Sequence, residues 1–161
     1  LKYAAEQDSN FVFFVDSDWK INKEITRQKI FNFLNFFGDS NYDFLFERSL
    51  PIKNAKTNLN SFWSHKVKLY DLNQTDEYDE GHVANEQFLC FKNNEKLKTF
   101  VNFWEEKNEI CLSNNVRPWC EGVEIGMSSA KAKMKMSPYK FKEMENCFSY
   151  QSKSGKIYQK F

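Results

Sequence analysis

The chain has 161 residues, of which 41% are hydrophobic and 17% aromatic, so it suits one domain with a substantial core and is not a disordered polypeptide. Its 23 basic and 22 acidic residues leave a net charge of +1, which offers no strong field to nucleic acid or to an anionic membrane. We therefore expect no nucleic-acid partner. No apolar run approaches the ~20 residues that span a bilayer, so we also expect no transmembrane segment in this chain.

The first predicted elements are a helix and a strand. Residues 1–7 read as the end of a helix and residues 8–10 as a turn. The run Phe11–Val15 contains only Phe and Val, which favours a strand buried on both faces of a sheet. A helix that leads into a buried strand is typical of the second half of a β-α-β crossover, so we expect the chain to start within a larger fold.

Two aspartates follow this strand directly. Asp16 and Asp18 are separated by Ser17, and side chains two residues apart on an extended backbone point the same way. Ligands bind at the carboxyl ends of strands in open α/β sheets, and carboxylate oxygens suit Mg²⁺ or Mn²⁺. The pattern therefore predicts a divalent metal site, with a solvated turn as the alternative reading.

The middle of the chain alternates between helical and extended patterns. We expect a helix over residues 23–37, a half-exposed strand over 41–48, a loop over 52–61, a strand around 67–70, and an acidic loop over 73–82. A short buried strand follows at 87–91. Asn93 and Asn94 should then cap a helix whose apolar face comprises Leu97, Phe100, Val101 and Trp104.

The last predicted helix carries two glutamates. It spans residues 121–136, with Glu121 and Glu124 three apart on one face near its start. Acidic residues are favoured there by the helix dipole, which is a structural explanation for both. Residues 137–161 are basic and aromatic and read as a C-terminal arm, either solvated or folded back over a phosphate-bearing site.

The four cysteines predict no zinc site. Cys90, Cys111, Cys120 and Cys147 form no Cys-x-x-Cys pair, so we expect free thiols, with a Cys111–Cys120 disulfide as the alternative in an oxidising compartment. The compartment itself stays open between the cytoplasm and, if a targeting sequence lies upstream, the Golgi or ER lumen.

Three segments in this order resemble those of a GT-A-fold glycosyltransferase. Residues 1–19 resemble the helix and strand that lead to the family's Asp-x-Asp, residues 85–93 its acceptor-side strand, and residues 119–129 its segment with acidic residues at a helix start. The resemblance covers about residues 1–136 and implies an α/β fold, a GT-A-like (Rossmann-like) mixed sheet flanked by helices. The nucleotide-binding first half of such a domain would be largely missing, so we expect a single, truncated domain over residues 1–161 that binds donor weakly alone.

The resemblance also implies a function: metal-dependent transfer of a sugar from a nucleotide-diphosphate donor to a hydroxyl of a glycan, protein or lipid acceptor. Asp16 and Asp18 would hold Mn²⁺ or Mg²⁺ and, with Ser17, contact the donor. Trp19, Trp119 and Asn85 would contact the acceptor. Glu121 or Glu124 would act on the acceptor hydroxyl; many members have Asp directly after the first glutamate, and Gly122 stands there in this chain.

Two other functions fit the same residues. Asp16 and Asp18 could serve another Mg²⁺- or Mn²⁺-dependent enzyme, such as a phosphoryl-transfer hydrolase, although Trp19-Lys20 does not match the Gly-Thr that usually follows Asp-x-Asp in phosphatases. A non-enzymatic carbohydrate-binding or interaction domain would instead stack sugars on Trp19, Trp63 and Trp119.

Overall fold

A computed structural model of the chain describes residues 1–15, 19–21, 25–46, 49–57, 64–84, 88–116, 122–137, 148–151 and 157–160. Its helices are α1 (Lys2–Ala5), α2 (Arg27–Asp39), α3 (Ile52–Thr57), α4 (Ser64–Leu69), the 3-10 turn η1 (Leu72–Gln74), α5 (Glu95–Ser113) and α6 (Gly122–Lys131). Its strands are β1 (Phe11–Val15), β2 (Trp19–Ile21), β3 (Phe44–Phe46), β4 (Ser49–Pro51), β5 (His82–Ala84), β6 (Phe88–Lys92), β7 (Met136–Ser137), β8 (Phe148–Gln151) and β9 (Ile157–Lys160).

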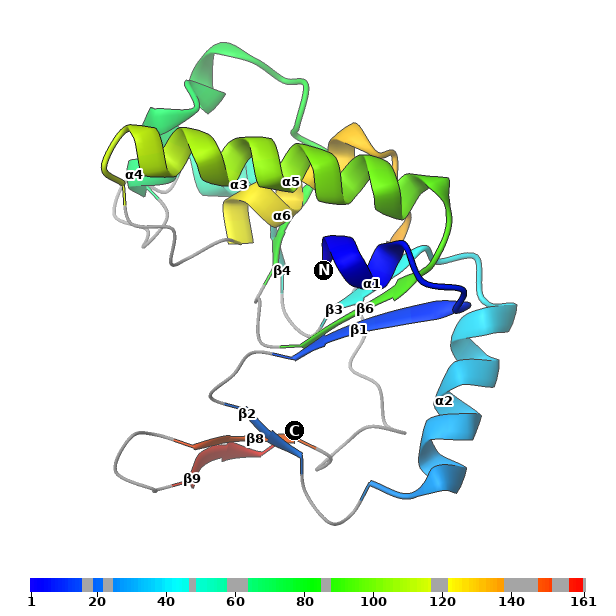
Figure 1. Cartoon of the computed structure of the whole chain (residues 1–161). Helices are drawn as coiled ribbons and strands as arrows, with labels where there is room; N and C mark the ends of the chain where they lie inside the picture. The colour runs from blue at the N-terminus through cyan, green and yellow to red at the C-terminus, as the bar shows by residue number, and fades with distance from the viewer. Residues whose placement is uncertain are drawn as a thin grey trace.

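The largest sheet has the strand order β1-β6-β3-β7. Strand β6 runs antiparallel to both β1 and β3, whereas β3 and β7 are parallel, so β1, β3 and β7 share one direction. Helices α1, α5 and α6 lie above the sheet in Figure 1, and α2 stands at the opposite side. The prediction of an α/β fold with a mixed sheet flanked by helices is thus confirmed at this level.

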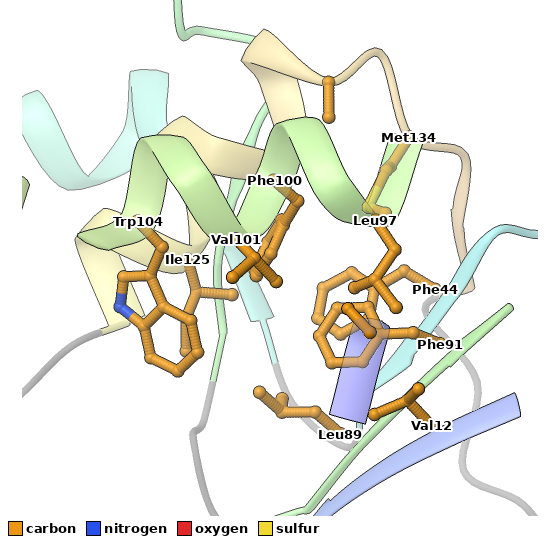
Figure 2. Close-up of a cluster of buried hydrophobic side chains, with 12 residues drawn as sticks. Val12, Phe44, Leu89, Phe91, Leu97, Phe100, Val101, Trp104, Ile125 and Met134 are labelled. Atoms are coloured by element: carbon orange, nitrogen blue, oxygen red, sulfur yellow. The ribbon is translucent and has the colours of Figure 1, made fainter. Parts of the chain in front are cut away.

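The alternation of side chains along each strand builds two cores, one on each face of this sheet. The core beneath α2 contains Phe33, Phe37, Leu45 and Cys90, with Phe11 and Val15 packed against it. The core beneath α5 and α6 contains Val12, Phe44, Leu89, Phe91, Leu97, Phe100, Val101, Trp104 and Ile125, drawn in Figure 2. Full burial of each large apolar side chain contributes about 1.5–3 kcal/mol, so these two cores hold the sheet and helices together.

Strand β1 is covered by helices on both faces, as its apolar sequence predicted, but its burial is incomplete. It pairs only with β6 in the part of the chain that the structure describes, so it is an edge strand there. Phe13 remains 40% exposed although its ring lies 5.9 Å from that of Phe33. A five-residue strand of Val and Phe has the composition of an interior strand and occupies an edge in this sheet.

The start of helix α5 follows the prediction closely. Asn94 is its N-cap, and the side-chain oxygen accepts hydrogen bonds from the backbone N–H groups of Lys96 and Leu97 at 3.0 and 3.2 Å. The predicted apolar face of this helix is buried. The preceding strand, β6, also forms where it was expected, one residue later at each end.

Two segments between β4 and β5 were predicted wrongly. The expected loop at residues 52–61 begins with helix α3, which buries Ile52 and Ala55 three residues apart. The expected strand around residues 67–70 is helix α4 and the turn after it. Apolar residues at Val67 and Leu69 fit the alternation of a strand. The structure buries the adjacent residues Lys66 and Val67, which lie on the buried side of a helix.

Other boundaries differ by a few residues. Helix α2 begins at Arg27, because Thr26 provides an N-cap hydrogen bond to Lys29 N at 3.2 Å. The predicted strand over residues 41–48 is reduced to β3 among its described residues. Helix α6 ends at Lys131 and not at residue 136, because Lys133 adopts a left-handed backbone (φ 50°) and the chain then enters β7.

The C-terminal arm contributes strands. β8 pairs antiparallel with both β2 and β9, which gives a separate sheet in the order β2-β8-β9, at the bottom of Figure 1. The described residues of the arm thus form two strands, one of which pairs with β2. No described helix combines the length and apolarity needed to cross a membrane.

Candidate functional site

Glu124 is the only predicted site residue whose side chain the structure describes. Trp19 is described by its backbone, as the first residue of β2. The other predicted site residues lie outside the described part of the chain: Asp16, Ser17, Asp18, Asn85, Trp119 and Glu121.

The end of β1 and the start of α6 share one core. Phe14, two residues before Asp16, packs against the same cluster that contains Ile125, the neighbour of Glu124. Trp104 of α5 joins them, with its ring 6.1 Å from that of Phe14 and, in Figure 2, its indole beside Ile125. Phe14 of β1 and Ile125 of α6 thus pack in one core, on the face of the main sheet that α5 covers.

The C-terminal strand β8 lies beside the residue that follows the aspartates. Trp19 is paired with Tyr150, Lys20 with Ser149 and Ile21 with Phe148. This backbone pairing ties the C-terminal arm to the segment immediately after Asp18. β8 itself has no charged residue, and of the arm's five lysines Lys160, in β9, is the one within the described residues.

Glu124 lies in the first turn of α6 and has no exposed surface. Its Oε1 atom accepts hydrogen bonds from Lys66 Nζ, from Tyr70 OH at 2.8 Å and from Cys111 Sγ at 3.1 Å. Its Oε2 atom is also buried but has no hydrogen-bond partner among the described residues. The carboxylate is therefore asymmetric: all of its protein donors reach one oxygen.

The partners of Glu124 come from two other helices and contact one another. Lys66 of α4 is fully buried, and its Nζ also donates to Cys111 Sγ at 3.0 Å. Tyr70 follows α4 by one residue, four after Lys66, so both side chains leave the same helix face. The Tyr70 hydroxyl lies 2.8 Å from Cys111 Sγ and can donate its single proton to Lys107 O at 2.9 Å or to Glu124. We call Lys66, Tyr70, Cys111 and Glu124 the buried polar cluster.

The electrostatics of the buried polar cluster follow from burial and the Lys66–Glu124 ion pair. Burial lowers the pKa of Lys66, but hydrogen bonds to Glu124 and Cys111 outweigh it and leave the pKa raised. Burial, with the hydrogen bond to Cys111 and the charge of Glu124, raises the pKa of Tyr70. Burial also raises the pKa of Cys111, against the opposing hydrogen bonds from Tyr70 and Lys66. At neutral pH Lys66 therefore stays protonated, Tyr70 stays neutral and Cys111 stays a thiol.

Close backbone packing fixes α6 in place. A Cβ atom on Gly126 would lie 2.8 Å from the backbone of His82 in β5, and one on Gly81 would lie 2.2 Å from Gly126 O. The residues Gly122–Ser129 are all buried, so α6 is enclosed on every side and not only on its inner face. Ser128 and Ser129 remain satisfied there, because their hydroxyls donate to the helix carbonyls of Glu124 and Gly126.

The sequence reasoning missed Lys66, Tyr70 and the role of Cys111. Cys111 lies seven residues after Trp104, so it continues the apolar face of α5, and this spacing could have placed it in the core. It is a free thiol, as is Cys90, and the alternative disulfide with Cys120 is not formed. No local signal distinguishes Lys66 from the exposed lysine two positions later, because burial of a lysine depends on a partner from a distant segment.

No three His, Cys, Asp or Glu side chains gather closely enough to hold a metal ion in the part of the chain that the structure describes, which does not include Asp16 and Asp18. Comparisons of the chain with protein-family models, with curated proteins and with solved structures found no match.

Proposed function

We propose that this chain is part of a metal-dependent glycosyltransferase that moves a sugar from a nucleotide-diphosphate donor to a hydroxyl acceptor. The observation that carries the proposal is the shared core of Phe14 and Ile125. Phe14 lies two residues before Asp16, and Ile125 directly follows Glu124. A transferase needs its donor-binding carboxylates and its acceptor-binding carboxylate around one reaction centre. Strand β1 and helix α6 support such an arrangement from opposite ends of the sequence.

The roles follow from side-chain chemistry. Asp16 and Asp18 would supply the hard oxygen ligands that Mn²⁺ or Mg²⁺ prefers. Ser17, which lies between them in sequence, would contact the donor. The ion, when bound, would neutralise charge on the departing diphosphate as a Lewis acid. Glu124 or Glu121 would accept the proton of the attacking hydroxyl, and Trp19, Trp119 and Asn85 would hold the acceptor.

The pairing of β8 with β2 supports the donor side of the proposal. β8 belongs to the C-terminal arm, which has five lysines and two glutamates in sequence, and a net positive charge of this arm near the donor would favour an anionic ligand. The competing proposals of a phosphoryl-transfer hydrolase and of a carbohydrate-binding domain use the same surroundings. The alternatives differ in what they consume: a phosphoryl-transfer hydrolase consumes a phosphate ester, and a carbohydrate-binding domain consumes no substrate.

The test is the release of nucleoside diphosphate from a set of nucleotide sugars (UDP-glucose, UDP-galactose, UDP-N-acetylglucosamine and GDP-mannose) with Mn²⁺ and with a chelator. We expect slow release that requires the metal and falls at least about a hundredfold in Asp18→Asn, since a Lewis acid supplies several kcal/mol of stabilisation. Asp8→Asn is the matched control, because Asp8 is exposed in the turn before β1. Nucleoside diphosphate release that depends neither on the metal nor on Asp18 contradicts the proposed transferase. Sugar binding without release of nucleoside diphosphate favours the carbohydrate-binding domain.

A further inference from the structure

The two carboxylate oxygens of Glu124 differ: Oε1 is hydrogen-bonded and Oε2 is not bonded to any described residue. Three donors converge on Oε1 from α4, the turn after it and α5, whereas Oε2 is buried without a partner in the described structure. A buried carboxylate oxygen without a donor is costly, and such atoms in native proteins call for an explanation. A donor group on a ligand is the explanation that a reaction centre near the start of α6 offers.

The buried polar cluster is built to keep this carboxylate in one place. Lys66 supplies the counter-charge, and Tyr70 and Cys111 supply two further hydrogen bonds on the same oxygen. The cluster is anchored in turn, because Cys111 is fully buried in α5 and Lys66 is fully buried in α4. With Oε1 bound in this way, rotation of the carboxylate is restrained and Oε2 keeps a fixed direction.

We propose that Lys66, Tyr70 and Cys111 are positioning residues that hold the Glu124 carboxylate in place through Oε1, so that Oε2 accepts a hydrogen bond from the attacking hydroxyl. This inference rests on the proposed glycosyl transfer and assigns the hydroxyl-accepting role to Glu124 rather than Glu121. In the step itself, the hydroxyl oxygen forms a bond to the anomeric carbon while the bond from that carbon to the diphosphate breaks. The hydroxyl proton passes to Oε2 and the electron pair of the broken bond leaves with the diphosphate.

The test uses water as the hydroxyl acceptor, so that no acceptor sugar has to be known. The rate constant and KM for donor hydrolysis are measured with Mn²⁺ for the unsubstituted chain, Tyr70→Phe and Glu124→Gln, each corrected for its folded fraction by circular dichroism. We expect kcat to fall at least about tenfold in Tyr70→Phe and more in Glu124→Gln, with donor KM unchanged, because a base contributes about 10²- to 10⁴-fold. Lys68→Met, on the exposed side of α4, should change neither constant.

A spectroscopic arm separates positioning from folding. With ¹³C-labelled glutamate, the Glu124 side-chain carbonyl resonance is assigned by its loss in Glu124→Gln. We expect Lys66→Met, which removes a hydrogen-bond donor to Oε1, to shift this resonance, while Lys68→Met leaves it in place. An unchanged resonance in Lys66→Met, or an unchanged kcat in Tyr70→Phe, overturns this inference alone. A chain with no metal-dependent donor turnover overturns the proposed function and this inference with it.

Discussion

Lys66 and Glu124 are both fully buried and form an ion pair. Removing one member leaves an unpaired charge in the core, which costs about 3–5 kcal/mol, a large fraction of the ~5–15 kcal/mol that stabilises a typical domain. Replacing both charges is far less harmful, because neither is then left without a partner. The pair is consequently a strong constraint on the sequence even though its net contribution to stability is small.

We predict that Lys66→Met lowers the free energy of unfolding by about 3–5 kcal/mol and that Lys66→Met combined with Glu124→Gln recovers part of the loss. Lys68→Met, an exposed residue of the same helix, should stay within about 0.5 kcal/mol of the unsubstituted chain. Urea denaturation followed by circular dichroism measures all three. Equal stabilities for Lys66→Met and Lys68→Met would show that the buried ion pair does not form.

The same residues predict a loss of stability at alkaline pH. The pKa values of Cys111, Tyr70 and Lys66 are all raised by folding from ordinary values of 9.0, 10.0 and 10.5. The unfolded chain releases these protons at the ordinary values while the folded chain still holds them, so stability is complete below about pH 9 and falls as the pH rises. Denaturant unfolding between pH 7 and 11 should show this fall, and Tyr70→Phe should make it shallower. If the free energy of unfolding falls equally steeply with pH in Tyr70→Phe, Tyr70 does not contribute to the pH dependence.

At the scale of elements, the contact of α6 with β5 depends on two glycines. Gly126→Ala places a methyl group against the backbone of His82 and the side chain of Ile52, at 2.8 and 3.0 Å. Backbone cannot yield as a flexible side chain can, so we expect a loss of about 1–3 kcal/mol despite the better helix propensity of alanine.

Gly38→Ala is the matched substitution, because Gly38 also lies in a helix, α2, and its added methyl would meet only the Phe11 ring at 3.5 Å, an ordinary contact. This variant should be neutral or up to about 1 kcal/mol more stable. Thermal or urea unfolding of the two variants side by side gives the comparison. A Gly126→Ala variant as stable as Gly38→Ala would contradict the close packing of α6.

Elements with strong local signals were predictable, and those defined by distant partners were not. The five apolar residues of β1 and the Asn94 cap with the spaced apolar residues of α5 gave the right type of structure. Helices α3 and α4 have six residues each and no long repeat, so their sequences fit a loop or a strand as well. Of the candidate site, Glu124 was placed in a first helical turn by its spacing, but its burial and its partner Lys66 depend on the folded arrangement of α4, α5 and α6.

At the scale of the whole molecule, the main sheet lies between α2 on one face and α1, α5 and α6 on the other. The residues expected at the reaction centre leave this framework from β1, from α6 and from the β2-β8-β9 sheet. The proposed glycosyl transfer therefore depends most on whether Asp16 and Asp18, which follow β1 in sequence, bind a divalent cation.

The most direct measurement is the binding of Mn²⁺ to the unsubstituted chain, Asp16→Asn, Asp18→Asn and Asp8→Asn, followed by the loss of the free-ion electron paramagnetic resonance signal. We predict one site in the unsubstituted chain and in Asp8→Asn, and affinity weakened at least about tenfold, or ~1.4 kcal/mol, in each of the other two variants. Equal affinity in all four proteins, or no binding by the unsubstituted chain, would contradict the proposed metal-dependent transfer.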